Sequence, residues 1–330
     1  ATAFNVKDGD TFKVAGIEFI KFPDVDGMTP VVAKNILFNS RFGDNNDLRS
    51  SNALKRLKEE ILPKICDAIG EENVCTFPTD LTAWDGTVLK ARNIIGAYNP
   101  DSKKRVMLCA HWDSRPYADY DADEKNHKKP IDGANDGASG VGVILEIVRQ
   151  LSIRKAKGEY IPSVQVVLFD CEDMGTPAHY TGKERPDTWC LGSQYWAKAY
   201  KQAIVNGKSS NCKLQYGILL DMVGDPSATF PREYFSTNYA GNYVEQLWRT
   251  ATQLGYGRYF VQQAAYPITD DHYYVNTLAG VPCVDIIDYK PQNGTGFAEW
   301  WHTQQDDMRN INKQTLQAVG ETVITTICSR

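Results

Sequence analysis

The strongest constraint in this sequence is a regular alternation between apolar, strand-like runs and stretches with helical spacing. Strands are predicted at residues 93–98, 105–110, 164–169, 216–220 and 281–287, and helices at residues 137–151, 191–205, 243–254 and 312–327. This alternation is typical of a mostly parallel sheet with helices on both faces. We therefore expect an α/β fold with a mixed, mostly parallel central sheet, in a single domain over residues 1–330. Residues 1–45 are expected to form an N-terminal extension packed on that domain.

Two further local patterns precede and interrupt this alternation. Residues 52–69 also have helical spacing, and Pro63 is expected to kink that helix. The segment Asn99-Pro100-Asp101 predicts a turn between the first two strands.

Composition and charge exclude several classes of protein. Hydrophobic residues make up 42% of the chain and charged residues 23%, which is ordinary for a globular protein. The formal net charge of −5 argues against a nucleic-acid partner, because phosphate binding requires a clustered basic face. No apolar run reaches the roughly 18–20 residues that a membrane helix needs. The sequence begins at Ala1 and not at Met, as in a processed or engineered fragment whose targeting segment has been removed.

The eight cysteines form no C-x-x-C pair, which argues against a structural zinc ribbon. Two disulfides remain open from the sequence, Cys66 with Cys75 and Cys190 with Cys212. The cysteines therefore give only a weak indication of the cellular compartment in which the protein works.

Polar residues gather where the predicted strands end. In open α/β sheets, ligands bind outside the carboxyl ends of the strands. A single histidine or aspartate there is usually structural, but a converging set of imidazoles and carboxylates matches what zinc accepts. The candidates are His111, Asp136, Asp173, Asp221 and His302.

Two of these segments carry additional signals. Asp136 stands in a glycine-rich segment before a predicted helix, where it is expected to cap the helix while facing the site. Glu172 and Asp173 are adjacent in an extended segment, so one side chain can bind metal while the other faces substrate. A carboxylate beside a metal site can act as general base and then general acid.

Taken in order, these segments resemble the zinc-dependent aminopeptidase superfamily, whose pattern runs H-x-D, N-D-G, E-D, L-D and H-T. The match runs from about Asn93 to Thr303, which is about two thirds of the chain. The resemblance implies that the five candidates above are the ligands of a two-metal aminopeptidase. Glu172 would then activate a water molecule.

Two segments resemble, within that superfamily, the animal-type glutaminyl cyclase family. They are Pro267-Ile268-Thr269-Asp270-Asp271-His272 and Phe297-Ala298-Glu299-Trp300-Trp301-His302-Thr303. This resemblance implies one zinc ion per chain, bound by Asp136, Asp173 and His302. It also implies that Glu172 shuttles a proton and that Asp221 shares a hydrogen bond or proton with Asp270.

The same resemblance assigns the surroundings of the metal. Ile268, Phe297 and Trp301 would wall the pocket, and Trp189 would act as a lid. His111 and Asp113 would lie just outside the metal ligands. Asp173 stands where the animal enzymes carry Glu, and residues 174–189 depart from the animal pattern, so the chain looks more like a bacterial member of the family.

The activity that the resemblance implies is conversion of an N-terminal glutamine of a peptide or protein into pyroglutamate, with release of ammonia. A periplasmic or secreted location, with an anchor in a removed N-terminal segment as one possibility, follows from the same resemblance. Two alternatives remain open: a two-zinc aminopeptidase and a non-catalytic interaction domain that kept the fold.

Overall fold

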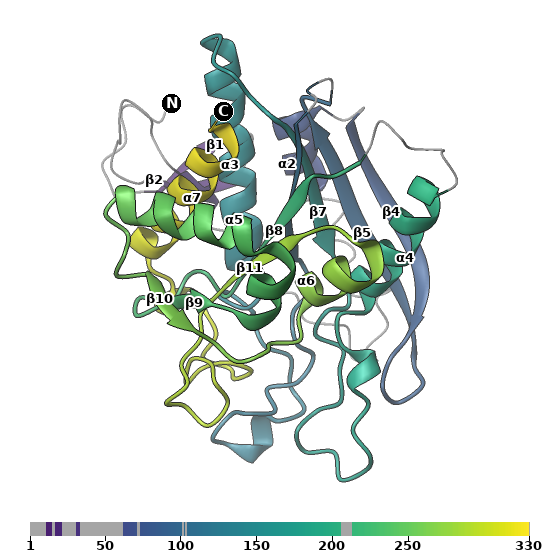
Figure 1. Cartoon of the computed structure of the whole chain (residues 1–330). Helices are drawn as coiled ribbons and strands as arrows, with labels where there is room; N and C mark the ends of the chain where they lie inside the picture. Colours follow the sequence, from purple (N-terminus) through teal and green to yellow (C-terminus); the bar gives the residue numbers. More distant parts are fainter. Residues whose placement is uncertain are drawn as a thin grey trace.

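The structure is a computed structural model that describes residues 11–14, 17–21, 31–33, 62–70, 73–100, 102, 104–205 and 213–329 (Figure 1). The N-terminal part of the helix predicted at 52–69 and most of the extension predicted at 1–45 lie outside these residues. Within the extension, strands β1 (Thr11–Val14), β2 (Ile17–Lys21) and β3 (Val31–Ala33) form a small antiparallel sheet.

A six-stranded sheet with the order β11-β8-β6-β7-β5-β4 forms the centre of the fold. Its parallel strands are β6 (Arg105–His111), β7 (Ser163–Phe169), β8 (Tyr216–Asp221) and β11 (Cys283–Ile287). Two antiparallel strands, β5 (Val88–Tyr98) and β4 (Val74–Thr82), complete one edge. The predicted mixed, mostly parallel sheet is therefore confirmed.

The strand predictions differ from the structure at this antiparallel edge. β5 begins before the predicted start at Asn93, and β4 was not predicted. β4 contains Pro78 and Asp80, residue types that sheets usually confine to edges, so its sequence lacks an apolar run. Asn99 makes the predicted turn with a φ of 49°, yet β7 lies between β5 and β6.

Helices cover both faces of the sheet, as predicted (Figure 1). One face packs α2 (Leu62–Ile69), α3 (Ala138–Ala156), α5 (Tyr234–Gln253) and α7 (Lys313–Cys328). The other packs α4 (Leu191–Val205), α6 (Asp271–Tyr274) and a π-helical turn at Val275–Ala279. The strand β6 serves both faces, because Leu108 joins the α3 side and Cys109 joins the α4 side.

Helix boundaries mostly agree with the sequence, with one correction. α5 begins at Tyr234, well before the predicted start at Tyr243. The kink expected at Pro63 stays a prediction, because only Leu62–Ile69 of that helix is among the described residues. Short elements complete the described chain: β9 (Phe230–Arg232), β10 (Phe260–Ala264) and 3₁₀ turns at Glu124–Asn126, Pro186–Thr188 and Met308–Asn310.

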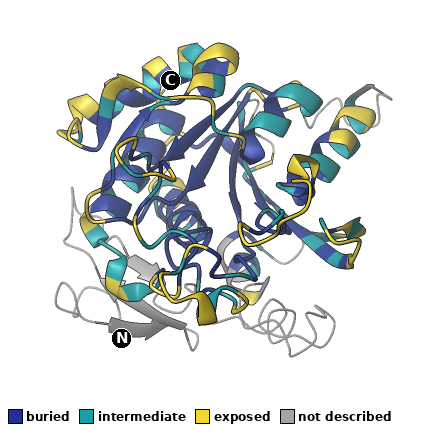
Figure 2. Ribbon diagram, turned by 90° about the horizontal axis from the view of Figure 1, so that it is seen from below, coloured by how far each residue is buried: buried dark blue, intermediate teal, exposed yellow. Residues whose placement is uncertain are grey.

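Long connections follow β6, β7 and β11 and gather at one end of the sheet, below it in Figure 1. Figure 2 looks onto this end and shows buried strands leading into loops that mix buried and exposed residues. Most of the polar segments singled out from the sequence lie in these loops or at the strand ends that lead into them, while Asp221 ends β8 and residues 267–272 lead into α6.

Neither Cys75 nor Cys190 is in a disulfide, which rules out both pairings that the sequence left open; Cys212 lies outside the described residues. Among the helices of the described part, none combines the length and the apolar character that crossing a membrane requires.

Glycine allows α3 to begin close against the strand ends. A Cβ at Gly140 would lie 2.0 Å from the carbonyl oxygen of Leu220 and 3.0 Å from the Cβ of Ala110. The helix therefore starts beside the ends of β6 and β8, which brings the residues before it to the polar loops.

We predict that Gly140→Ala lowers the free energy of unfolding by about 3 kcal/mol, because the added methyl group forces the helix away from β8. Gly320→Ala in α7 is the matched control, since its Cβ would meet only Val143 at an ordinary 3.6 Å. Urea unfolding measures both. Equal stability of the two variants would contradict the close approach.

Candidate functional site

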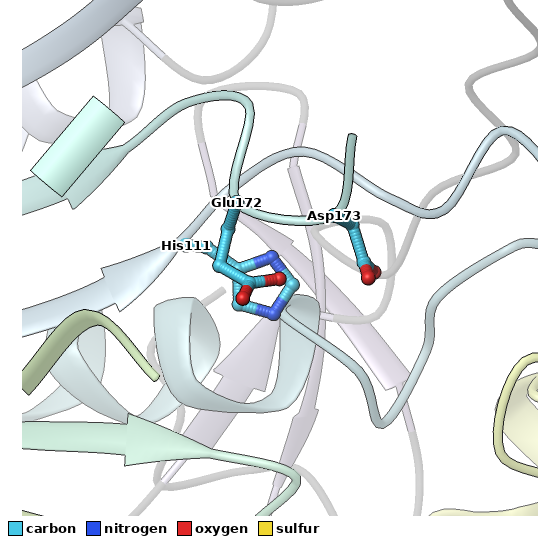
Figure 3. A group of neighbouring side chains, drawn as sticks. All are labelled: His111, Glu172 and Asp173. Carbon is cyan, nitrogen blue, oxygen red and sulfur yellow. The ribbon is translucent and has the colours of Figure 1, made fainter. Parts of the chain in front are cut away.

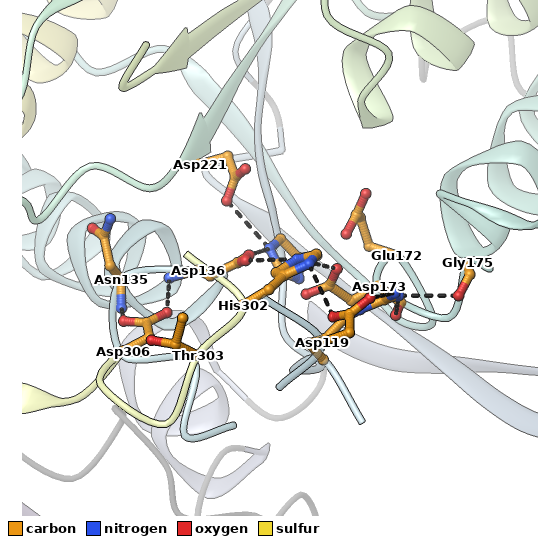
Figure 4. Close-up of polar contacts among 12 residues, drawn as sticks. Asp119, Asn135, Asp136, Glu172, Asp173, Gly175, Asp221, His302, Thr303 and Asp306 are labelled. Atoms are coloured by element: carbon orange, nitrogen blue, oxygen red, sulfur yellow. Dashed lines mark hydrogen bonds and ion pairs between the residues drawn. The ribbon is translucent and has the colours of Figure 1, made fainter. Parts of the chain in front are cut away.

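Three buried side chains converge at the carboxyl end of the sheet, those of Asp136, Asp173 and His302 (Figure 4). His302 Nε2 lies 3.4 Å from Asp136 Oδ2 and 3.1 Å from Asp173 Oδ1. One ligand atom from each residue lies within 4.8 Å of the others. This is a group of two carboxylates and one imidazole around a common point.

Each of the three comes from a different connection. Asp136 lies in the turn before α3, and Asp173 follows β7. His302 comes from the connection after β11 and has a φ of 54°, in the left-handed region that non-glycine residues rarely occupy. Non-glycine residues in that region are frequent at functional sites.

A second group shares Asp136. His111, the last residue of β6, places its Nε2 3.0 Å from Asp136 Oδ1 and 3.2 Å from Asp221 Oδ1. Asp136 thus lies between two histidines, with one carboxylate oxygen directed to each. Asp221 ends β8, so both groups are built at strand ends.

The chemistry of the first group fits a zinc ion. Asp136 Oδ2 and Asp173 Oδ2 are buried and have no hydrogen-bond partner among the described residues. Burial and the charge of Asp136 raise the pKa of Asp173. For Asp136, burial acts to raise the pKa, but the hydrogen bonds and charges of His111 and His302 outweigh it and lower the pKa. A divalent cation would favour ionisation of Asp173 as well, and two carboxylates with one imidazole are ligands that zinc accepts.

Asp113 holds the segment that carries two of the candidate residues. Its carboxylate accepts hydrogen bonds from the backbone N–H of Glu172 at 3.1 Å and of Asp173 at 3.2 Å. It also lies 3.6 Å from Nδ1 of His111. Asp113 therefore fixes the backbone of the Glu172–Asp173 pair.

Asp306 fixes the backbone of Asp136 in the same way that Asp113 fixes the backbone of Asp173. It accepts hydrogen bonds from the N–H of Asn135 at 2.7 Å and of Asp136 at 3.0 Å. Asp306 was not predicted from the sequence, although it stands shortly after the histidine-threonine pair in the same connection. The prediction that Asp136 caps α3 is wrong. Gly137 occupies the cap position with a φ of 87°, and the Asp136 side chain faces the histidines.

Asp119 and Arg115 were also missed. Asp119 Oδ1 lies 3.6 Å from Nδ1 of His302, and Arg115 forms a two-pronged pair with Asp119 at 3.2 and 2.9 Å. Arg115 also donates to the carbonyl oxygens of Asp173 and Gly175. Such contacts behind the ligands orient an imidazole and its neighbours. Only their proximity to the H-x-D segment marks them in the sequence.

Glu172 lies beside His111 and Asp173 (Figure 3). The Glu172 and Asp173 carboxylates make different side-chain contacts. Glu172 Oε1 accepts a hydrogen bond from the Cys190 thiol at 3.1 Å. Burial, followed by the charge of Asp173, raises the pKa of Glu172 well above its usual range. The group is thus suited to hold a proton near neutral pH.

Asp270 faces the same pocket from the start of α6. It caps that helix by accepting the N–H of Asp271. Burial and the charge of Asp221 raise the pKa of Asp270 to about 7. The two carboxyl groups thus interact electrostatically, but the hydrogen bond that the resemblance implied between them is not among the contacts of the described residues. Asp221 contacts His111 instead.

A pocket of about 310 Å³ opens over these groups. Ile268, Phe297, Trp301 and Trp189 line it, together with Asp136, Glu172, Asp173, Asp221, Asp270 and His302. The Trp301 and Trp189 rings both stack on His302, at centroid distances of 3.6 and 6.2 Å. Glu184 and Pro186, from the connection that departs from the animal pattern, add to the lining. The pocket therefore joins apolar walls to an acidic floor.

Comparison with known proteins places the chain in a defined group. The profile of Peptidase family M28 matches residues 93–327. A glutaminyl cyclase of Tannerella forsythia is 47% identical with a TM-score of 0.77, covering 85% of this chain and 92% of that one. A Zn-dependent exopeptidase of Parabacteroides distasonis is 46% identical with a TM-score of 0.77, covering 85% and 91%.

A curated relative is more distant. The glutaminyl-peptide cyclotransferase of Bos taurus is 26% identical over 248 residues, which span 69% of this chain and 63% of the bovine protein. The expected α/β fold of the zinc aminopeptidase type is thus confirmed at the level of whole solved structures.

We predict that Asp113→Asn weakens zinc binding about 10- to 100-fold, because one amide oxygen cannot accept both N–H groups that Asp113 now satisfies. Competition with a chelator measures the affinity. Asp123→Asn, at the cap of the exposed turn Glu124–Asn126, is the control and should bind zinc as the wild type does. Unchanged affinity in Asp113→Asn would refute this role.

Proposed function

We propose that this chain, which belongs to peptidase family M28, is a glutaminyl-peptide cyclotransferase that converts N-terminal glutamine into pyroglutamate with release of ammonia. The observation that carries the proposal is the meeting of Glu172 and Asp270 in one pocket with the convergent group of Asp136, Asp173 and His302. The likeness to the Tannerella forsythia glutaminyl cyclase supports it.

Asp136, Asp173 and His302 would hold a single zinc ion. When bound, zinc supplies Lewis-acid polarisation of the side-chain amide carbonyl of the substrate glutamine. His111 and Asp113 lie behind these ligands, where His111 contacts Asp136 and Asp113 holds the backbone of Asp173.

Glu172 moves the proton in this proposal. It accepts a proton from the α-ammonium group, which frees the amine to form a bond with the side-chain amide carbon. Glu172 then passes this proton to the amide nitrogen, the carbon–nitrogen bond breaks, and ammonia leaves. Glu172 takes up the second proton, which the ring nitrogen loses as it becomes the neutral lactam, and releases it to solvent. The raised pKa of Glu172 suits a group that must hold the first proton between its two transfers.

Asp221 and Asp270 hold the leaving nitrogen. Their mutual charge and their burial leave one of them protonated near neutral pH, so the pair offers both an acceptor and a donor to an amide group. The attack is intramolecular, so correct orientation supplies a large part of the rate.

Trp301, Ile268, Phe297 and Trp189 enclose the glutamine side chain, and the rest of the peptide extends from the pocket. The proposed partners are therefore peptides and proteins that begin with glutamine. By family resemblance we also propose a bacterial origin, a periplasmic or secreted location, and a single catalytic domain over residues 1–330 on which residues 1–45 pack.

One observation favours a second candidate, a two-zinc aminopeptidase. His111, Asp136 and Asp221 form another group whose ligand atoms lie within 4.8 Å of one another. Hydrolysis would need a water molecule as nucleophile and would release a free amino acid. A metal count of two zinc ions per chain would favour this reading.

The direct test is mass spectrometry of a peptide with N-terminal glutamine after incubation with the zinc-loaded protein. The proposal requires loss of ammonia from an otherwise intact peptide. Release of free glutamine and a shortened peptide would identify the aminopeptidase instead.

We predict that Glu172→Gln retains zinc but loses at least about 100-fold in kcat, because the amide cannot accept a proton. Ammonia release and zinc content are measured on the same sample. Glu159→Gln, which changes an exposed glutamate away from the pocket, serves as the control. Near-normal turnover in Glu172→Gln would reject the proton-shuttle role.

We predict that Asp270→Ala lowers kcat on glutamine peptides by about 100-fold, the order found when a positioned transition-state contact is removed. It should also raise the zinc affinity of the His111–Asp136–Asp221 group, because Asp221 ionises more readily once the neighbouring Asp270 carboxyl is removed. Steady-state kinetics and metal titration read the two effects. Normal cyclisation by this variant would reject the role of Asp270 in holding the leaving nitrogen.

A further inference from the structure

Glu233 occupies an unusual position at the start of α5. It is the N-cap residue, and its carboxylate accepts the N–H of Phe235 at 2.9 Å and of Ser236 at 2.6 Å. Short residues such as Asp, Asn and Ser are preferred for this task. The longer glutamate is therefore not explained by the cap alone.

The extra length of Glu233 reaches the wall of the pocket. Its Oε1 also accepts the N–H of Ile268 at 3.1 Å, and its Oε2 lies 3.0 Å from Nε2 of His272. Ile268 lines the pocket, and His272 belongs to α6, which Asp270 caps. One carboxylate thus holds the segment on both sides of Asp270.

His272 faces a second carboxyl group on its other side. Its Nδ1 lies 3.4 Å from Asp285 Oδ2 on β11, and the N–H of Asp285 donates to the Ser236 hydroxyl of α5. The side chains of Glu233, His272 and Asp285 are all fully buried. A buried chain of polar contacts therefore links α5, α6 and β11 directly behind the pocket.

The contacts of Glu233, His272 and Asp285 determine which of these side chains are charged. Burial acts to raise the pKa of Glu233, but the hydrogen bond and charge of His272 and two backbone N–H groups outweigh it and lower that pKa to about 2. Glu233 is thus an ionised acceptor, and Nε2 of His272 must carry the proton between them. Burial and nearby carboxylates raise the pKa of Asp285, which favours its neutral form.

We infer that Glu233 is a positioning residue which, through the Ile268 N–H and the His272 ring, fixes where the Asp270 carboxyl lies in the pocket. The inference rests on the proposed cyclase function and extends it to a residue that does not line the pocket. A buried charge with four fixed donors is a rigid anchor, and a shift of about 1 Å in a catalytic group can cost about 100-fold in rate.

The test uses Glu233→Asp in the zinc-loaded full chain. Aspartate still caps α5 but is one methylene too short to reach Ile268 and His272 as well. We expect normal zinc content and a fall in kcat of about 10- to 100-fold with little change in KM, because Asp270 acts on the leaving nitrogen. Wild-type kcat, or a loss confined to KM, would overturn the inference.

Asn312→Ala is the matched control. Asn312 caps α7 by accepting the N–H of Gln314 and of Thr315, and it does not line the pocket. This variant should lower the melting temperature but leave kcat unchanged. An equal fall in kcat for both variants would reduce Glu233 to a helix cap and overturn the inference. If Glu233→Asp does not fold, Glu233→Gln replaces it, with the same fall expected and the same refuting result.

A second measurement is independent of turnover. Nitrogen-15 NMR of the imidazoles should show a hydrogen-bonded Nε2–H for His272, identified by its absence in His272→Gln, and this signal should be lost in Glu233→Asp. Retention of the signal in that variant would contradict the Glu233–His272 hydrogen bond. If the wild type itself releases no ammonia, the proposed function fails, while this signal still tests that hydrogen bond.

Discussion

The Asp136 carboxylate lies between two histidines, and the arrangement of the site depends on it. One oxygen is 3.0 Å from His111 and the other is 3.4 Å from His302. His111 ends a strand in the middle of the sheet, whereas His302 comes from the connection after β11. Asp136 therefore links the central sheet to the loop that carries His302 and Trp301.

Backbone geometry makes this placement possible. Gly137 has a φ of 87°, and a Cβ there would lie 2.7 Å from the His111 ring. Gly140 allows α3 to touch the carbonyl of Leu220. Asp306 then accepts the N–H groups of Asn135 and Asp136 and fixes the turn. The glycines leave room for the close approach, and the buried Asp306 carboxylate fixes the backbone of the turn. Asp113 fixes the Glu172–Asp173 backbone in the same way.

Much of the fold and of the site was predictable from the sequence. Strand and helix positions follow from periodicity, and the site residues from polar segments that recur in order at strand ends, together with the family resemblance. The strand β4 was not predicted because Pro78 interrupts any apolar run. The roles of Asp306, Asp119 and Glu233 were not predicted because side chains that bind backbone N–H groups or orient a neighbour follow no fixed spacing. The contact of Asp221 with His111 in place of Asp270 depends on side-chain geometry alone.

We propose that one zinc ion lies between Asp136, Asp173 and His302 while His111 and Asp221 remain a hydrogen-bonded pair. Anomalous X-ray diffraction at the zinc edge, from crystals of the zinc-loaded protein, locates the metal. We expect one strong peak per chain among those three side chains. A second peak of similar height between His111, Asp136 and Asp221 would refute the single-zinc site.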